Sequence, residues 1–462
     1  MRLFFVPLIT AALVVVPGPA ATAAQTVRVT SLSALQSALD KANAGDTIAL
    51  ADGSYAASST LSIKRSGTAS APVTVTAEHV GKVTVTAEHV GKATITGSKT
   101  FSFASGVSNV VLRGFKFRNG ASLSIPAGAS HNRLSRNDFQ LTSDGNWVTV
   151  SGDDTEVDRN VFQNRTSQGV FLQILGPSKA MAQRVHVHHN YFFNHQFAGS
   201  NGGESIRLGL SDHQSYPAHA LLEYNLFEKA DGDSEAISVK SSDNVVRYNT
   251  IRDSVGYIVL RHGNRSVVEG NLLFGSGIRF HGNDHKVVGN YVANTGGRAI
   301  VFGSGDEADS GPTSKLHDRP DRVTVAYNTV LGSKEVIDGD GGDFKPKDCV
   351  VADNVVKGTS GTLVTLPSGS TVKYEGNITF GGAAGIPSRN VDPKLVKDAN
   401  GLFRLASGSP AINTGAGSYP FAGTDFDLQA RTGVYDVGAD EYFASGATRV
   451  PLVKADVGPA ST

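Results

Sequence analysis

A short stretch of the chain, DGDSEAISVK at residues 231–240, places carboxylates and a lysine around a run of apolar residues. Asp233 and Glu235 are two positions apart, so their side chains point to the same face of an extended segment. Lys240 stands at an odd offset from both, and a bend or bulge must intervene before all three can converge. A group of this kind could bind a cation or transfer a proton.

Two neighbouring stretches supply further groups. In YIVLRHGN, Arg261 follows Lys240 by 21 residues, and in SNGGESIRLG, Asn201 and Glu204 stand on a glycine-rich loop. Asn201, Asp233 and Glu235 all offer hard oxygen donors of the type that holds Ca²⁺. Each charged residue taken alone could equally belong to an ordinary row of solvent-exposed charges. The whole group of residues is less easily explained in that way.

The elements that must position these residues belong to a repeat. In ten places an asparagine follows alternating apolar residues, and the shortest interval, from Asn271 to Asn290, is 19 residues. An interval of this length fits one coil of a parallel β-helix, and longer intervals fit a coil with a surface loop. The repeated residues are Asn137, Asn160, Asn190, Asn225, Asn249, Asn271, Asn290, Asn328, Asn354 and Asn377.

Stacking of coils explains this repeat physically. Short period-two strands cannot bury a face alone, whereas each strand in a stack pairs with the equivalent strands above and below it. An asparagine at each bend tolerates left-handed backbone angles, and stacked amides can hydrogen-bond along the axis. A β-propeller would need regular repeats of about 40 residues, which the intervals do not show. We therefore predict an all-β, single-domain parallel β-helix of about 12 coils, over residues 25–445.

One coil of sequence becomes one strand spacing in such a fold. Lys240 and Arg261 are therefore expected as neighbours on the outer surface, roughly 4.8 Å apart along the axis. A helix is expected only near the N-terminus, where Leu32, Leu35 and Leu39 recur at helical spacing. This short amphipathic helix would cap the open end of the strand stack.

The two ends of the chain and its composition limit where the protein can be located and which partners it can bind. An arginine, a short apolar run and the residues ATAA predict a signal peptide over residues 1–24 and a secreted protein. No later segment is long enough to span a bilayer. Lys+Arg and Asp+Glu both total 42, so net charge gives no reason to expect a nucleic acid or membrane partner. Residues 446–462 lack the strand rhythm and are expected to form a flexible tail.

The stretches NGGESIRLG, DGDSEAISVKSSDN and RHGN together resemble the core motifs of polysaccharide lyase family six in residue type, order and spacing. This family contains alginate lyases and dermatan sulfate lyases of the chondroitinase B type. The resemblance is strong over about residues 185–300 and reaches the rest of the chain only through the repeat. It implies a right-handed parallel β-helix, in agreement with the repeat.

The resemblance also implies roles for individual residues. Lys240 would be the general base and Arg261 the general acid. The Ca²⁺ ligands would be Asn201, Asp233 and Glu235. The family places Glu where this chain has Asp233, whose side chain is one methylene shorter, so Asp233 is the weaker of the two carboxylate assignments. Contacts with substrate, each of which could equally be structural, are expected from Arg207, His262, Arg279 and His281.

These residue types suit β-elimination from a uronic acid unit, whose C5 hydrogen is weakly acidic. A divalent cation on the substrate carboxylate would neutralise the charge that develops when the C5 proton leaves. A lysine acts as a base only when it is neutral, and a neighbouring Ca²⁺ together with Arg261 would favour that form of Lys240. Arg261 would then assist the departing 4-oxygen.

Alginate is the first expected substrate, because most members of the resembled family act on it, and dermatan or chondroitin sulfate is the second; a monomer is expected. A glycosidase would use carboxylic acids alone and leave the Lys–Arg pair without a part. A mannuronan epimerase would carry a DPHD stretch, which the chain lacks. A non-catalytic glycan-binding β-helix stays open. The long insert between Asn290 and Asn328 is a candidate for a loop at the end of the groove.

Overall fold

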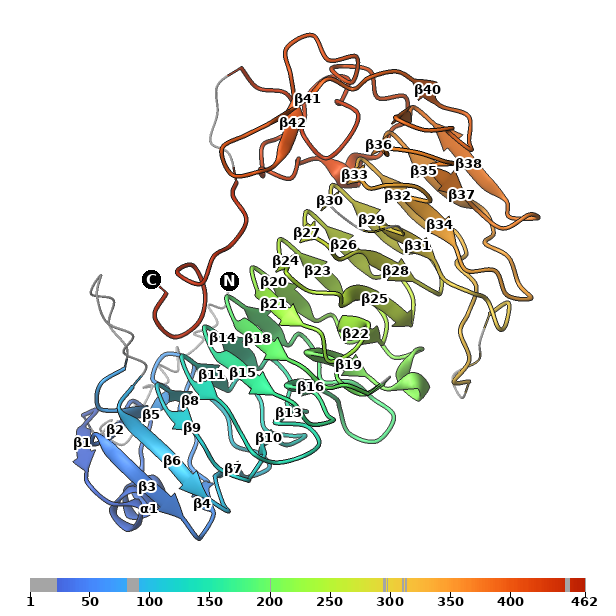
Figure 1. Ribbon diagram of the computed structural model, residues 1–462. Coiled ribbons are helices and arrows are strands. Elements are labelled where there is room, and N and C mark those ends of the chain that lie inside the picture. Colours follow the sequence, from blue (N-terminus) through green and yellow to red (C-terminus); the bar gives the residue numbers. More distant parts are fainter. Residues whose placement is uncertain are drawn as a thin grey trace, which may run out of the picture.

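The computed structural model describes residues 23–80, 91–199, 201–293, 296, 298–309, 311, 314–444 and 449–461 of the 462-residue chain. All but two residues of the expected signal peptide therefore lie outside the described residues. From β2 onward, successive strands join three long parallel sheets in turn, and the chain winds into a parallel β-helix (Figure 1). The predicted all-β solenoid is confirmed.

The three sheets run the length of the molecule. Sheet 1 consists of β1 (Thr26–Val29), β2 (Thr47–Leu50), β5 (Val73–Ala77), β8 (Val110–Arg113), β11 (Arg133–Ser135), β14 (Glu156–Asp158), β17 (His186–His188), β20 (Leu221–Glu223), β23 (Val245–Arg247), β26 (Val267–Glu269), β29 (Lys286–Val288), β32 (Thr324–Ala326), β35 (Cys349–Ala352) and β38 (Val372–Glu375). Sheet 2 consists of β3 (Gly53–Ala57), β6 (Ala93–Gly97), β9 (Lys116–Phe117), β12 (Asp138–Phe139), β15 (Val161–Arg165), β18 (Tyr191–His195), β21 (Leu226–Ala230), β24 (Thr250–Arg252), β27 (Leu272–Phe274), β30 (Tyr291–Ala293), β33 (Thr329–Leu331), β36 (Val355–Lys357), β39 (Ile378–Phe380) and β40 (Arg389–Asn390).

Sheet 3 carries the candidate site. It consists of β4 (Leu61–Ile63), β7 (Phe101–Phe103), β10 (Leu123–Ile125), β13 (Val148–Val150), β16 (Leu172–Ile174), β19 (Ile206–Gly209), β22 (Glu235–Lys240), β25 (Tyr257–His262), β28 (Ile278–Phe280), β31 (Ile300–Phe302), β34 (Ile337–Gly339) and β37 (Val364–Thr365). Its 12 strands in the described part of the chain agree with the expected number of coils.

The predicted asparagines hold the bends between sheets 1 and 2, and all ten are fully buried. Oδ1 of Asn249, a representative case, accepts hydrogen bonds from the backbone N–H and Nδ2 of Asn225, at 2.9 and 3.0 Å. Its Nδ2 donates to Leu222 O at 3.0 Å and to Asn271 Oδ1 at 3.1 Å. The amide ladder is therefore confirmed. The expectation that the asparagine itself adopts left-handed angles is wrong, because the turn is made one residue earlier, at Tyr248 with φ 56°.

Aromatic rings in the interior stack at the spacing of the coils. The centroids of neighbouring rings are 4.8 to 5.0 Å apart along one row, close to the distance between strands in a sheet. Repetition of one side chain at one position of the coil therefore builds a continuous core. The row consists of Phe117, Phe139, Phe162, Phe192 and Phe227.

Helix α1 (Leu32–Lys41) lies at the N-terminal end of the solenoid, as predicted (Figure 1). Ser31 caps it by accepting a hydrogen bond from the backbone N–H of Ala34 at 3.2 Å. Leu35 and Leu39 are buried against the first coils. The helix therefore covers strand edges that would otherwise be open to another chain. No helix in the described residues has the length and apolar character needed to cross a membrane.

The chain beyond β40 leaves the coils. A hairpin of β41 (Leu395–Lys397) and β42 (Phe403–Leu405) and the 3₁₀ turn η2 (Pro420–Ala422) lie at the C-terminal end, and the last residues run back along the outside of the solenoid (Figure 1). We call residues 449–461 the C-terminal strap. This segment, expected as part of a flexible tail, packs Val457 against Val161, Tyr191 and Leu226, and Gly458 N donates to His189 O at 2.8 Å.

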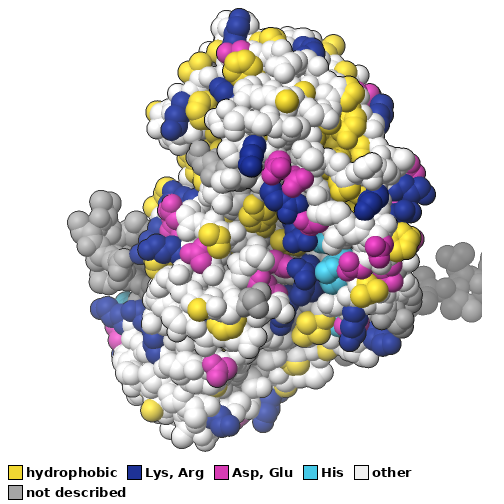
Figure 2. All heavy atoms as spheres, turned by 45° about the vertical axis from the view of Figure 1, so that its right-hand side comes forward, with side chains coloured by type: hydrophobic (Ala, Val, Ile, Leu, Met, Phe, Trp, Pro, Cys, Tyr) yellow, Lys and Arg dark blue, Asp and Glu magenta, His cyan; other side chains and the backbone are white. Residues whose placement is uncertain are grey.

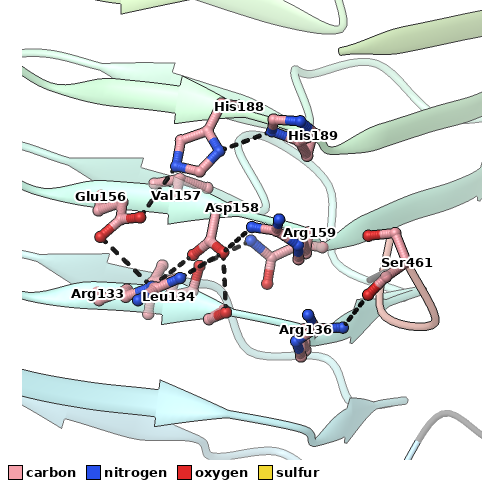
Figure 3. Close-up of polar contacts among 12 residues, drawn as sticks. Arg133, Leu134, Arg136, Glu156, Val157, Asp158, Arg159, His188, His189 and Ser461 are labelled. Atoms are coloured by element: carbon pink, nitrogen blue, oxygen red, sulfur yellow. Dashed lines mark hydrogen bonds and ion pairs between the residues drawn. The ribbon is translucent and has the colours of Figure 1, made fainter. Parts of the chain in front are cut away.

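A network of charged side chains ties neighbouring coils together on sheet 1 (Figure 3). Arg133 donates from Nε and Nη2 to the two carboxylate oxygens of Asp158, at 2.8 and 2.7 Å, and His188 Nε2 is 2.9 Å from Glu156 Oε1. Close by, Arg136 Nη1 donates to the backbone carbonyl of Ser461 in the strap at 2.6 Å. Because the carboxylates here are satisfied by arginine and histidine, the network is explained as structural.

Candidate functional site

Two bulges in sheet 3 bring the predicted residues together. Between β22 and β25 the register shifts twice, between Glu235 and Ile237 and between Val239 and Lys240, so Ala236 and Arg261 are the extra residues. Ile237 and Val239 point into the core, and an unbroken strand would turn Glu235 inward with them. The first bulge instead turns Glu235 to the outer face that carries Lys240. The prediction that a bend or bulge must intervene is confirmed.

Each catalytic candidate lies beside a buried carboxylate. Arg261 Nη1 donates to Glu235 Oε1 at 2.6 Å, and Lys240 Nζ is 3.7 Å from Glu204 Oε1. Glu204 and Glu235 are 1% and 6% exposed. Burial raises the pKa of the Glu235 carboxyl, and the charges of Arg261 and Lys240 oppose that rise. The sequence placed Glu204 on the same loop as Asn201 but gave it no role, and the structure makes it the ion-pair partner of Lys240.

The two glycine-containing loops pack backbone against backbone in front of β19 and β22. A Cβ on Gly203 would lie 2.0 Å from Gly232 O, so no other residue fits at that position. The Asp233 carboxylate fixes this arrangement, since its Oδ2 accepts from the backbone N–H of Gly202 at 2.8 Å. Asn201, on the same loop, is exposed.

The donor set fits a hard cation, although its members are not equally available. Oε2 of Glu204 and Oε2 of Glu235 are buried and accept no hydrogen bond, although Arg207 Nη1 lies 3.7 Å from Glu204 Oε2, and a buried carboxylate oxygen that accepts no hydrogen bond is costly unless a cation or water completes it. Asp233 Oδ2, by contrast, already accepts from its loop. In the described part of the chain, the triads of carboxylate or imidazole ligand atoms that lie within 4.8 Å of one another are found elsewhere. Of the predicted ligands, Glu235 therefore has a carboxylate oxygen available for a hard cation, as does the neighbouring Glu204, whereas Asp233 is bound to its own loop and Asn201 is exposed.

The predicted arginine contacts lie on one outward row of sheet 3. Arg207 pairs with Ser238 in the next strand, Ser238 with Val259, and Val259 with Arg279. Arg207 Nε donates to Gln173 Oε1 at 2.6 Å. Both arginines lie on strands that flank those of Lys240 and Arg261, so they border the same outer face. The face that includes this sheet gathers basic, acidic and histidine side chains (Figure 2).

A pocket of about 180 Å³ opens beside Glu235. Arg279 Nη2 lies 2.5 Å from Asp340 Oδ2, and Arg298 Nε lies 2.6 Å from Asp338 Oδ2, so each arginine in the pocket wall is matched by a carboxylate. Neither Arg298 nor Asp340 was singled out in the sequence. The lining residues are Ser234, Glu235, Val255, Tyr257, Val259, Arg279, Arg298 and Val301.

The predicted histidines meet a third histidine from the long insert. The ring of His317 stacks on His262 and on His281, with centroids 4.9 and 4.5 Å apart, and its Nδ1 is 2.9 Å from Asp306 Oδ2. His262 and His281 are buried, whereas the side chain of His317 is 22% exposed. Burial is the main reason that the pKa of His262 is lowered to about 3, so this imidazole is neutral near pH 7. His317 was missed, although its insert was recognised from the interval length.

The fold and this site place the protein among the parallel β-helix proteins that carry charged clefts on an outer sheet. The chain belongs to the chondroitinase B family, whose model matches residues 29–366. The recognition of polysaccharide lyase family six, which contains chondroitinase B, is thereby confirmed. No curated protein matches the sequence.

Several solved structures share the fold. The family-six alginate lyase AlyGC is 24% identical, with a TM-score of 0.71, over 82% of this chain and 55% of its own. A mannuronic acid specific family-six lyase from human gut microbiota is 23% identical, with a TM-score of 0.65, over 78% of this chain and 87% of its own. A family-six alginate lyase in complex with a trisaccharide is 20% identical, with a TM-score of 0.66, over 84% and 92%. The present chain thus spans 55% of the length of AlyGC, and at these identities the likeness establishes the fold.

Proposed function

We propose that the protein is a polysaccharide lyase that cleaves a uronate-containing polymer, alginate in the first place, by β-elimination. The observation that carries the proposal is the pairing of Lys240 with Glu204 and of Arg261 with Glu235 on adjacent outer strands. Family membership supports the reaction class. Related structures described as alginate lyases support the choice of substrate.

Lys240 is assigned as the base. Once deprotonated, its amine takes the C5 proton of the uronate, the C5–H electrons form the C4–C5 double bond, and the C4–O bond breaks with its electrons on the leaving oxygen. Glu204, the buried partner of the lysine, keeps Nζ at one place on the surface. The reaction then depends on the proton being removed at a fixed position next to the breaking bond.

Arg261 is assigned to the leaving oxygen. A guanidinium keeps its charge in proteins and donates several hydrogen bonds in a fixed geometry, so Arg261 stabilises the departing 4-oxygen until that oxygen is protonated. Its bond to Glu235 aims the guanidinium at the cleft. The product would be an unsaturated sugar at the new non-reducing end.

Calcium is proposed as the cofactor. Held by Asn201, Asp233 and Glu235, with Glu204 as a further donor, Ca²⁺ would supply the positive charge that offsets the substrate carboxylate as its C5 proton leaves. The two buried oxygens that accept no hydrogen bond, on Glu204 and Glu235, support this assignment. Addition of Ca²⁺ to chelator-treated protein should raise the unfolding temperature, which is a readout independent of turnover.

The test follows ultraviolet absorbance of purified mature protein mixed with alginate, or separately with dermatan sulfate, with and without a chelator. Absorbance that rises with alginate and is lost with chelator is expected. Absorbance that rises with dermatan sulfate alone would indicate that dermatan sulfate, the second expected substrate, is the polymer that is cleaved. A flat trace with both polymers and added Ca²⁺ would count against a lyase.

Lys240→Ala separates a lyase from a glycan-binding protein. A lyase variant should lose nearly all turnover and keep its affinity for the polymer, whereas a binding module has no turnover to lose and would lose only part of its affinity. A secreted enzyme is also proposed, since a polymer substrate lies outside the cell. N-terminal sequencing of the exported protein should place cleavage near residue 24.

A further inference from the structure

A second pocket lies beyond the candidate site, at the corner where sheet 2 passes into sheet 3. It has a volume of about 360 Å³. Its walls come from the loops that follow β33 and β36 and from β42 of the C-terminal hairpin. The lining residues are Gly296, Leu331, Gly332, Ser333, Lys357, Gly358, Thr359 and Phe403.

Phe403 and Lys357 line this pocket, and the exposed Lys397, which pairs with Phe403 across the hairpin, adds a second ammonium group near the same ring. Lys357 Nζ lies 5.9 Å and Lys397 Nζ 6.0 Å from the centre of the Phe403 ring. Neither lysine forms an ion pair with a carboxylate in the described part of the chain, in contrast to the matched arginines beside Glu235. Ser333 and Thr359 add hydroxyl groups at the rim.

The walls are held in place by the core behind them. Lys397 and Phe403 face each other as a cross-strand pair of the hairpin, and the backbone N–H of Phe403 donates to the hydroxyl of Tyr291 at 3.1 Å. Leu402, next to Phe403, is fully buried in a cluster with Leu331 of β33. The hairpin is therefore fixed on the coils, and the pocket is preformed.

The pocket adjoins the candidate site along the axis. Arg298 lines the pocket beside Glu235, and Gly296, two residues earlier, lines the second pocket. Ser333 Oγ donates to Gly296 O at 3.3 Å, which joins the two corner loops. Five strand spacings of sheet 3 separate β22 from β37, the strand that follows Lys357, so the second pocket reaches about 24 Å beyond Lys240 along the axis. A polymer that fills the cleft could extend this far.

We propose that the pocket lined by Lys357 and Phe403, together with Lys397 beside the Phe403 ring, is an accessory binding site for an acidic polysaccharide, and this inference rests on the proposed function. The apolar face of a sugar ring would stack on Phe403, and the uronate carboxylate would pair with the two ammonium groups. A site of this kind holds the chain at a distance from the bond that is cleaved. It should therefore matter for long polymers and not for short oligomers.

The experiment compares initial rates on alginate polymer and on an alginate trisaccharide. The double variant Lys357→Gln/Lys397→Gln and the variant Phe403→Ala are expected to lower kcat/KM for the polymer at least fivefold and to leave the trisaccharide rate unchanged. Phe403→Tyr, which keeps an aromatic face, should restore the polymer rate. The double variant alters only charged surface groups, so it tests the site even where Phe403→Ala affects folding.

The matched control is a lysine–aromatic pair on another side of the protein. Lys286 Nζ of sheet 1 lies 4.6 Å from the centre of the Phe421 ring in η2, and Lys286→Gln and Phe421→Ala should leave both rates unchanged. Equal polymer rates in wild type and the site variants, or equal losses in the control variants, would overturn the inference.

Affinity electrophoresis in gels that contain alginate separates this failure from failure of the proposed function. A wild-type protein without lyase activity, but retarded by alginate only while Lys357 and Lys397 are intact, would reject the lyase and support the binding site. Retardation that is the same in wild type and the double variant would reject the binding site whether or not the protein is a lyase.

Discussion

Removal of one rung of the asparagine ladder, by Asn249→Ala, should destabilise the fold by about 2–6 kcal/mol. The side chain makes five hydrogen bonds in a fully buried bend. Its loss leaves the backbone N–H of Asn225 and the carbonyl of Leu222 without the amide that joined them. A buried polar group left unpaired costs about 1–3 kcal/mol, and two such groups give the range stated.

The measurement is urea unfolding followed by circular dichroism, with the midpoint compared at an unchanged slope. Asn164 offers a control, since it accepts a hydrogen bond from the Asn194 side chain at 2.9 Å but on the exposed surface. Because Asn164 has φ 60°, its substitution is to glycine, which adopts that angle freely, and a change within about 0.5 kcal/mol is expected. If Asn249→Ala matched this control, the ladder would not be a main source of stability and the reasoning would be refuted.

Three further outcomes are expected. His317→Ala, which removes the ring that stacks on two histidines of the candidate site, should lower kcat/KM by about tenfold, whereas an unchanged rate in steady-state assays would show that the stack is not used. Val457→Ala should lower the free energy of unfolding by about 1–2 kcal/mol in urea titrations without changing kcat, because it loosens the strap far from the cleft; a change in kcat would contradict this. Burial acts to raise the pKa of Glu223, but hydrogen bonds from His186 and Arg247 outweigh it and lower the pKa to about 2. The contribution of ionised Glu223 to the free energy of unfolding is therefore complete above about pH 4.3, the pKa of a glutamate in the unfolded chain, and is lost as the pH falls toward 2. Glu223→Gln should therefore reduce the dependence of the free energy of unfolding on pH in this acid range.

The repeat made the fold predictable because it is a local property repeated many times. The recurring asparagines gave the coil length, and their buried amides bond as expected. The left-handed residue was assigned one position too late. Residues as different as Tyr248 and Gly270 adopt that angle, so residue type at the turn carries little signal.

The site was predictable where it depends on motif spacing, and not where it depends on contacts between distant segments. Spacing placed Lys240 and Arg261 on neighbouring strands and required the bulge that is observed. The ion pair of Lys240 with Glu204 and the stack of His317 on two other rings arise from loops whose paths are set by tertiary packing. The periodicity of the sequence gives no information about the paths of these loops. The anchored strap was missed for the same reason.

The strap has a consequence for how the solenoid can change in length. A stack of coils can in principle gain or lose members one at a time, since each coil is bonded mainly to its neighbours. The strap, however, is fastened to three different coils, by Arg449 to Gly270, by Leu452 to Thr250 and by Gly458 to His189. A coil deleted between these points would shorten the solenoid by one strand spacing, about 4.8 Å, and leave the strap out of step with its anchors. The C-terminal strap is therefore compatible with only one number of coils across the middle of the molecule, which is the part that carries the cleft.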